Sequence, residues 1–551
     1  MDEKIRERAA SAEVRKYNEA GEDKSAGPVP EEGELINVSG HVQELDRTFG
    51  VWSICNMAVM SDNAWAAGGG TLVIALYNGG GPGVMFGLIA ATFFYCFIAA
   101  ALAELSSAMP TSANVYHWAS VTAGPKWGRI CSFYAGWWNA LAWVFGAASV
   151  SLSAANAVVA MYELHHPDYL PKNSHVFVAY LGICIIDSAL VLFGQRILAK
   201  LSNVFGALCI LIVFVTILVC AIMPSQTGAG YATNAFVWTD WQNLTGYSSD
   251  GFVFLLGMLN GAFAIGTPDG VCHLCEEIPR PRKNIPIGVA CQLAAGFLTT
   301  FFYYIALFYA VTSLDAVQNS RIISLPLAGI YQQATRSDAG TTGLLFIFFL
   351  DVVITVPGAY VTAGRMLWTL GRDEATPIAG FVRKVSPRWR NPFNAQLLVA
   401  ALITILGLIY IGSVQAFTAF TGVFAIFTTM SYLAAMLPNM LTARKYVKPG
   451  PFWIPSPWSY IVYGIASAYI IVFNVIYMFP YALPVDATTM NYSCVMTGGI
   501  TILLSLWYLW KRTRGYKGPA VLQEAHDDIM EGLVGLTKAE EEERRLRSGL
   551  I

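Results

Sequence analysis

Two aspartates lie in the middle of long apolar segments, beside residues that weaken a helix. Asp62 and Asn63 precede three consecutive glycines, and Asp269 stands between Pro268 and Gly270. An ionised carboxylate near the centre of a bilayer costs at least about 2.5–3.5 kcal/mol. Each aspartate therefore needs a bound cation, a proton or hydrogen-bond donors. The alternative is a purely structural role, in which the carboxylate caps the amides of an interrupted helix.

The residues around both aspartates predict interrupted helices. Pro268 lacks a backbone donor, and glycines adopt non-helical dihedrals at little cost. Lipid cannot satisfy the freed backbone groups, so they must line a cavity inside the protein, unless the glycines and Pro268 merely kink the helices. We expect non-helical backbone near residues 60–66 and 265–270, facing each other across a central cavity. The candidate substrate-binding residues at these breaks are Asp62, Asn63, Gly266, Thr267 and Asp269.

Aromatic residues near the aspartates suggest which ligand such a cavity would take. A quaternary ammonium group has no N–H donor, so it is recognised by aromatic ring faces and by a nearby negative charge. Simple packing is the competing explanation for each ring. The candidates for this role are Trp65, Trp143, Phe263 and Tyr360, with Asn139 one helical turn from Trp143.

The elements that must position these residues are membrane-spanning helices. Of the 551 residues, 55% are hydrophobic and only 13% are charged, against about 25% in an ordinary soluble protein. Apolar runs of about 20 residues, long enough to cross a hydrocarbon core of roughly 30 Å, recur along the chain. We therefore expect an all-α polytopic membrane protein. Its twelve predicted spans are 49–77, 82–109, 127–161, 174–194, 199–223, 250–276, 285–313, 340–370, 393–412, 414–441, 457–480 and 488–510.

The spacing of the two interruptions predicts internal symmetry. They fall in the first and sixth spans, as expected for an inverted repeat of five helices plus five with the substrate site at the midplane. The expected organisation is a transport core over 49–441 and two further helices over 457–510. Cytoplasmic tails over 1–48 and 511–551 flank these parts, and no cleavable signal peptide is expected at the start.

The distribution of basic residues predicts the orientation. With a cytoplasmic N-terminus, the inner loops hold nearly all Lys and Arg of the short loops, and the outer loops hold only Lys172, Arg321 and Arg336. This asymmetry places both termini in the cytoplasm. Asn243 of the Asn-Leu-Thr sequon then lies outside, where it is a candidate glycosylation site.

Other function classes find no support in the sequence. The net charge is −2, and the scattered basic residues form no nucleic-acid-binding surface. The ten cysteines lie inside or at the ends of apolar runs, which disfavours a disulfide framework, and Cys272 and Cys275 alone cannot complete a metal site. No Walker A motif, serine elbow or HExxH string occurs, so we expect neither an enzyme nor an ATP-driven pump, and no resident cofactor or metal.

Three strings resemble the amino acid–polyamine–organocation (APC) transporter superfamily, within it the fungal amino acid, GABA and choline permeases. They run over residues 103–118, 133–139 and 266–286, inside a resemblance that covers about 45–515. The resemblance implies a leucine-transporter-type fold of ten core helices plus two, with rocking-type alternating access. The strings Ser112-Ala-Asn-Val-Tyr116-His-Trp118 and Gly136-Trp-Trp-Asn-Ala-Leu-Ala-Trp143 are most similar to fungal choline permeases.

The driving ion is left open by the sequence. Protons or sodium are the alternatives, with Glu104, Asp351 and Thr355 as coupling candidates beside the two aspartates of the breaks. A cation entering through a negative-inside potential gains about 2.3 kcal/mol per 100 mV, so uptake without a coupled ion is a third possibility.

These observations together predict a plasma-membrane secondary transporter that imports a small organic cation, with choline first. The alternative is a GABA or amino-acid permease, in which the amides near Gly266 and Gly270 would hold a carboxylate. A nutrient sensor without transport is disfavoured by the short charged tails. The partners expected are a small-molecule substrate and the lipid bilayer, whereas the oligomeric state is left open.

Overall fold

The computed structural model describes residues 51–318, 320, 322–389, 391–487 and 489–519, so the two tails lie mostly outside the described part. Within these residues the chain is helical, and its β-type pairing is a single bridge between Asn78 and Asn243. Ten of the described helices are long and apolar enough to cross a membrane. They are α4 (Gly80–Ala108), α6 (Gly124–His165), α7 (Asn173–Phe193), α8 (Gln195–Gln226), α11 (Pro281–Ala310), α14 (Asp338–Arg372), α16 (Phe393–Gly412), α17 (Gln415–Leu441), α18 (Trp458–Ile476) and α19 (Ser493–Thr513).

The other two predicted spans are each broken. The first consists of α2 (Val51–Asp62) and α3 (Ala64–Leu76), and the sixth of α10 (Asp250–Ala264) and the 3-10 helix η1 (Gly270–Glu277). All twelve predicted spans therefore correspond to helical segments, with ends that differ by a few residues. The breaks fall five spans apart, in the positions that the inverted repeat requires.

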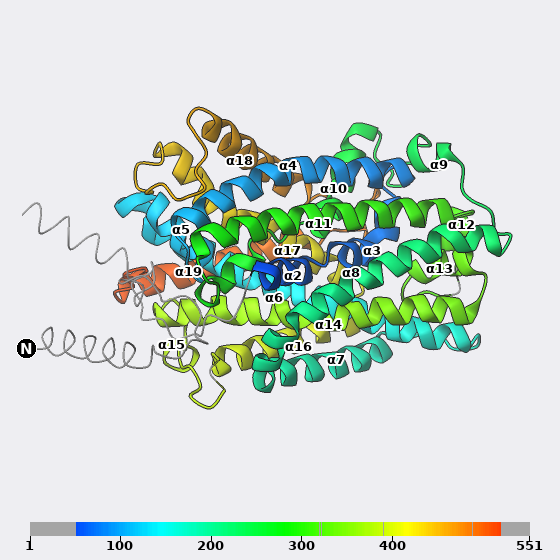
Figure 1. The fold of residues 1–551 in the computed structure, drawn as a ribbon, viewed down its shortest axis with the longest axis horizontal. Helices are drawn as coiled ribbons and strands as arrows, with labels where there is room; N and C mark the ends of the chain where they lie inside the picture. The colour runs from blue at the N-terminus through cyan, green and yellow to red at the C-terminus, as the bar shows by residue number, and fades with distance from the viewer. Residues whose placement is uncertain (1–50, 319, 321, 390, 488, 520–551) are drawn as a thin grey trace, which may run out of the picture.

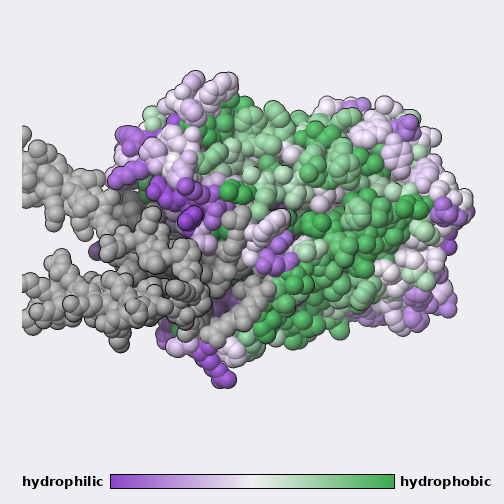
Figure 2. Space-filling view, viewed as in Figure 1, coloured by the Kyte–Doolittle hydropathy of each residue, from purple (hydrophilic) through white to green (hydrophobic). Residues whose placement is uncertain are grey.

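The helices run roughly parallel along the long axis of the molecule (Figure 1). The short helices α5 (Asn114–Thr122) and α15 (Ala379–Val382) lie at one end, whereas α9 (Asn234–Trp238), α12 (Leu314–Gln318) and α13 (Leu327–Thr335) lie at the other. Figure 2 shows a broad hydrophobic surface between two hydrophilic ends. Such a surface matches the lipid-facing belt of a multi-pass membrane protein.

The centre of the bundle is α6, which packs mainly against α14 and α17. Small residues on α6 allow these helices to approach, as is usual for helix packing in membranes. A Cβ at Gly146 would come within 2.6 Å of the Phe424 ring of α17, and a Cβ at Gly136 within 2.7 Å of Leu370 of α14. The close packing places Asn139 of α6 in the buried interior.

At the end of the molecule that carries α5, a buried ion pair ties the segment between α17 and α18 to α4. The carboxylate of Glu104 in α4 accepts hydrogen bonds from Arg444 Nη1 at 3.0 and 3.1 Å and from the backbone N–H of Ile454 at 2.8 Å. Tyr463 Oη of α18 donates to it at 3.1 Å. The Arg444 guanidinium also stacks on the Trp453 ring at 4.2 Å. The contacts of Arg444, Trp453 and Ile454 fix the segment between α17 and α18, and the Tyr463 hydrogen bond attaches α18 itself to α4.

We expect Arg444→Gln to destabilise the protein by about 3–5 kcal/mol, because it leaves the buried Glu104 carboxylate without its counter-charge. Thermal unfolding of the purified protein in detergent measures the effect. The double variant Glu104→Gln/Arg444→Gln is the matched control, since it removes both charges and should melt above Arg444→Gln. A double variant that melts no higher would show that the ion pair is not what stabilises this segment.

Candidate functional site

The first break is narrower than the sequence suggested. Only Asn63 leaves the helical path, with φ at +36°, and its carbonyl accepts from the N–H groups of Ala66 and Ala67 at 3.1 and 3.0 Å. The expectation of non-helical backbone over 60–66 was therefore too wide. The three glycines stay in α3, where a Cβ at Gly69 would come within 2.9 Å of Tyr303 Oη. They permit close packing rather than breaking the helix.

The second break is a stretch of irregular backbone over 265–269, as predicted. Gln292 of α11 satisfies the freed carbonyl of Thr267 through its Nε2, which also lies 2.9 Å from Thr267 Oγ1. Thr267 Oγ1 in turn donates to Asp62 Oδ1 at 2.7 Å. The two breaks face each other, as expected, and this side-chain hydrogen bond joins them directly, whereas the central cavity expected between them stays a prediction.

Asp269 is fully buried and saturated with hydrogen bonds. Its Oδ2 accepts at 2.8 to 3.4 Å from side chains of α5, α6 and η1, and its Oδ1 accepts from a tyrosine of α17. The five donors are Asn114, Asn139, Trp143, His273 and Tyr432. This carboxylate therefore fastens the unwound segment to three helices around it. Little capacity is left on it for a ligand's positive charge.

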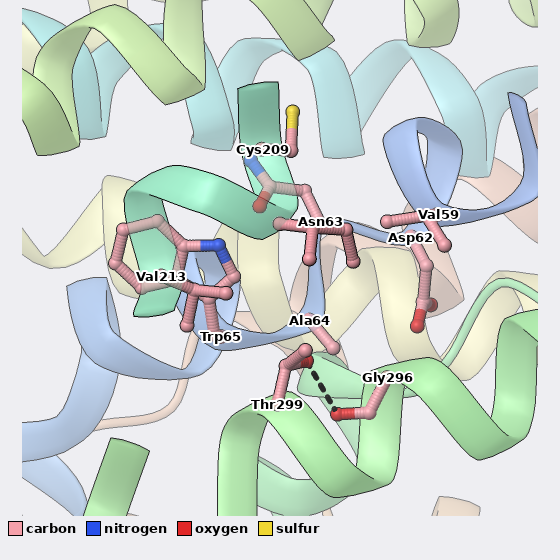
Figure 3. A pocket seen from close by; sticks show the side chains of 10 residues that line it. Val59, Asp62, Asn63, Ala64, Trp65, Cys209, Val213, Gly296 and Thr299 are labelled. Carbon is pink, nitrogen blue, oxygen red and sulfur yellow. Dashed lines mark hydrogen bonds between the residues drawn. The ribbon is translucent and has the colours of Figure 1, made fainter. Parts of the chain in front are cut away.

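Asp62 is buried differently. Its side chain is 7% exposed, and its Oδ2 has no hydrogen-bond partner among the described residues. Figure 3 shows the carboxylate on the side of α11, and a Cβ at Gly296 would collide with this same oxygen. The absence of a side chain at Gly296 is therefore what makes room for the carboxylate.

A narrow pocket lies beside the first break (Figure 3). It is lined by three of the predicted binding residues, which are Asp62, Asn63 and Trp65, and by residues of α8 and α11. Asn63 Oδ1 and Trp65 Nε1 also lack hydrogen-bond partners within the described part of the chain. The pocket thus gathers unpaired acceptors beside an indole ring.

The four candidate aromatic residues do not form one cage. Trp143 and Phe263 both pack edge-on against Phe424 of α17, with ring centroids 6.1 and 5.6 Å apart. Trp65 instead packs against Tyr303 at 5.1 Å. Tyr360 lies on the far side of α14, next to Cys184 of α7. Trp65 and Tyr360 therefore have ring or side-chain neighbours other than those of Trp143 and Phe263, which the sequence alone could not show.

The coupling candidates are also divided. Thr355 Oγ1 of α14 accepts from Asn63 Nδ2 at 2.8 Å and donates to the Asp351 carbonyl at 3.0 Å. Asp351 is fully buried, and its carboxylate faces the side chains of Asn63 and Cys209. Asp351 and Thr355 therefore stand directly behind the first break, whereas Glu104 belongs to the ion pair that holds α18.

Several residues of the site were not among the sequence candidates. His273 follows Asp269 by four residues, and Gln292 is a polar residue in an apolar span, so a sequence signal existed for both. Asn114, Tyr432 and Phe424 carry no such signal, because they reach the site only through the packing of α5 and α17.

At the other end of the molecule, Asn243 Nδ2 donates to Tyr247 O and Asp250 Oδ1, so its glycosylation stays a prediction.

The two aspartates should respond differently to loss of charge. Asp269→Asn replaces an acceptor of five hydrogen bonds by an amide that cannot satisfy them all, so we expect the melting temperature in detergent to fall by several degrees. Asp62→Asn disturbs one hydrogen bond and should melt close to the parent. Equal melting temperatures for the two variants would contradict the structural role assigned to Asp269.

Comparison with known proteins agrees with this architecture. The chain matches the amino acid permease family over residues 49–500. It is 29% identical to a choline transporter of Saccharomyces cerevisiae over 515 residues, which is 92% of this chain and 87% of that protein. An amino-acid permease of Arabidopsis thaliana is 27% identical, over 91% of this chain and 98% of that protein. A GABA-specific permease of S. cerevisiae is 24% identical, over 91% of this chain and 88% of that protein. The relatives are transporters and not enzymes. The chain therefore belongs to the amino acid permease family of the APC superfamily, as a multi-pass membrane transporter.

Proposed function

We propose that this transporter imports a small organic cation across the plasma membrane by alternating access, and that choline is its substrate. The observation that carries the proposal is the difference between the two buried carboxylates. Asp269 is saturated by five donors, whereas Asp62 keeps an oxygen without a hydrogen-bond partner among the described residues. A buried carboxylate in this state favours the approach of a positive charge. The similarity to a yeast choline transporter supports the same substrate.

Aromatic rings are available on both sides of the breaks for a trimethylammonium group. Trp143, Phe263 and Phe424 gather beside Asp269, and Trp65 lines the pocket that contains Asp62. Cation–π contacts contribute about 0.5–1 kcal/mol at exposed sites and about 2 kcal/mol when desolvated. Several such contacts together with one carboxylate suffice for specific recognition of a cation that donates no hydrogen bond.

A GABA or amino-acid permease is the second candidate, and the relatives with those names favour it. Such a substrate needs free backbone amides for its carboxylate. The N–H of Gly270 already donates to the Thr267 carbonyl at 2.9 Å, which removes one of the expected donors. The geometry therefore supports the cation better than the zwitterion.

Coupling to an ion is part of the same proposal. Asp351 is buried directly behind the first break, and Asn63 and Thr355 link its helix to that break. A proton or a sodium ion that changes the charge there would act on the helix junction that carries Asp62. We propose that protons drive transport and that Asp351, in addition to Asp62, carries a proton.

The charge of Asp62 can be tested directly. Asp62→Asn keeps the shape and removes the anion, so uptake of labelled choline should fall strongly while the protein still reaches the cell surface. Asp62→Glu is the matched control, because it retains the charge. Parallel uptake of GABA and several amino acids distinguishes the two candidate functions. Choline uptake by Asp62→Asn with the parent's affinity would reduce Asp62 to a capping residue.

Trp143 could contribute to choline binding in two ways, through its ring face and through the hydrogen bond of its Nε1, which lies 3.4 Å from Asp269 Oδ2. Two variants separate these contributions. Trp143→Phe keeps a π face and loses the donor, whereas Trp143→Leu loses both. We expect choline binding to weaken several-fold more in the leucine variant than in the phenylalanine variant, with folding of both checked by thermal unfolding.

The variant Trp65→Leu tests which of the two aromatic groups binds the cation. If Trp65→Leu weakens choline binding and Trp143→Leu does not, the cation lies beside Asp62 and not beside the Trp143 cluster. Parental affinity in both leucine variants would contradict recognition by aromatic rings.

A further inference from the structure

Two cysteine thiols meet where α2 lies against α11. The Sγ atoms of Cys55 and Cys291 are 3.1 Å apart, although the residues are 236 positions apart in the chain. Both cysteines are free and only partly buried. Neither belongs to the hydrogen-bond network of the two breaks.

Glycines on α11 hold the two helices close on either side of the thiols. A Cβ at Gly288 would come within 2.8 Å of Ile54 Cγ2, and a Cβ at Gly296 would collide with Asp62 Oδ2. Gly288 and Gly296 are about two helical turns apart, with Cys291 between them, and all three contact α2. The thiols therefore sit in the middle of a tight helix contact, and a covalent link between them would hold α2 against α11.

The break at Asn63 makes α2 a separate segment. The regular helix of α2 ends at Asp62, and α3 restarts at Ala64 with its own first hydrogen bonds to the Asn63 carbonyl. Besides α11, α2 packs against α8, α14 and η1. A change of dihedral angles at Asn63 can therefore turn α2 without unfolding α3.

We propose that Cys55 and Cys291 are a redox-active pair whose oxidation to a disulfide fastens α2 to α11. Hydrogen peroxide is the oxidant. It converts one thiol to a sulfenic acid with release of water, and the second thiol then displaces the hydroxyl group as water. The balanced change is two thiols and one peroxide to one disulfide and two waters. A disulfide has an S–S distance of about 2.05 Å, so the sulfurs need to approach by about 1 Å.

The disulfide has a mechanical consequence, which rests on the proposed transport function. If α2 must leave α11 for the site to open to one side, the covalent link holds the transporter in the arrangement seen here. Reduction of the disulfide releases α2. In a reducing compartment the pair stays as thiols, so transport is interrupted only under oxidation.

Formation of the disulfide can be tested without measuring transport. Purified full-length protein is treated with hydrogen peroxide, denatured, and its remaining thiols are labelled with a polyethylene-glycol maleimide. We expect the parent to lose two reactive thiols, to recover both with dithiothreitol, and to yield the Cys55–Cys291 linked peptide by mass spectrometry. Cys55→Ser and Cys291→Ser should each abolish this peptide, and Cys96→Ser, an exposed cysteine of α4, is the matched control that should retain it. Absence of the linked peptide in the oxidised parent would overturn the proposal.

The mechanical part compares uptake before and after peroxide in vesicles that contain the parent, Cys55→Ser or Cys291→Ser. We expect the parent to lose most of its uptake and to regain it with dithiothreitol, whereas each serine variant keeps its uptake. A parent that carries the disulfide and transports as before would show that α2 does not need to leave α11. If no substrate is transported even by the reduced parent, the proposed function fails, and the linked peptide still decides the chemical proposal.

Discussion

The structure depends on one constraint, which is that backbone interrupted in the middle of a membrane has no water to satisfy it. At the first break the problem is small, because Asn63 is the single residue outside the helices and its carbonyl caps α3. At the second break several residues are unwound, and the side-chain amides of Gln292 and Asn114 donate to the freed carbonyls of Thr267 and Asp269. α5 and α11 each contribute a side chain to this backbone, whereas α6 and α17 donate to the Asp269 carboxylate beside it.

The two buried aspartates have different roles. The Asp269 carboxylate accepts hydrogen bonds that hold the unwound segment in place, so Asp269 acts as a positioning residue. Asp62 is linked to the same segment through Thr267 alone and keeps an oxygen free of hydrogen bonds within the described residues. This division lets the site remain rigid around one carboxylate while the other stays available for a cation or a proton.

The same interruption that creates the site also creates movable parts. α2 is joined to α3 through a single non-helical residue, and it is held against α11 by glycine contacts and by the meeting of Cys55 with Cys291. In contrast, α6 is a continuous helix of 42 residues in the centre of the bundle.

The sequence by itself determined the spans, the two interruptions and the family, because hydrophobic length, Pro268 and the buried aspartates are local properties that lipid makes decisive. It could not determine the width of the first break, since Gly68 and Gly69 serve close packing against Tyr304 and Tyr303 of α11 and Gly70 lies against Ser153 of α6. Nor could it determine which aspartate is saturated, because Asn139 and Tyr432 lie 130 and 163 residues away from Asp269 in the chain. Only the tertiary structure decided these points. Helix rotation fixes which side chains meet, and it places Trp65 against Tyr303 and Tyr360 beside Cys184, whereas Trp143 packs against Phe424.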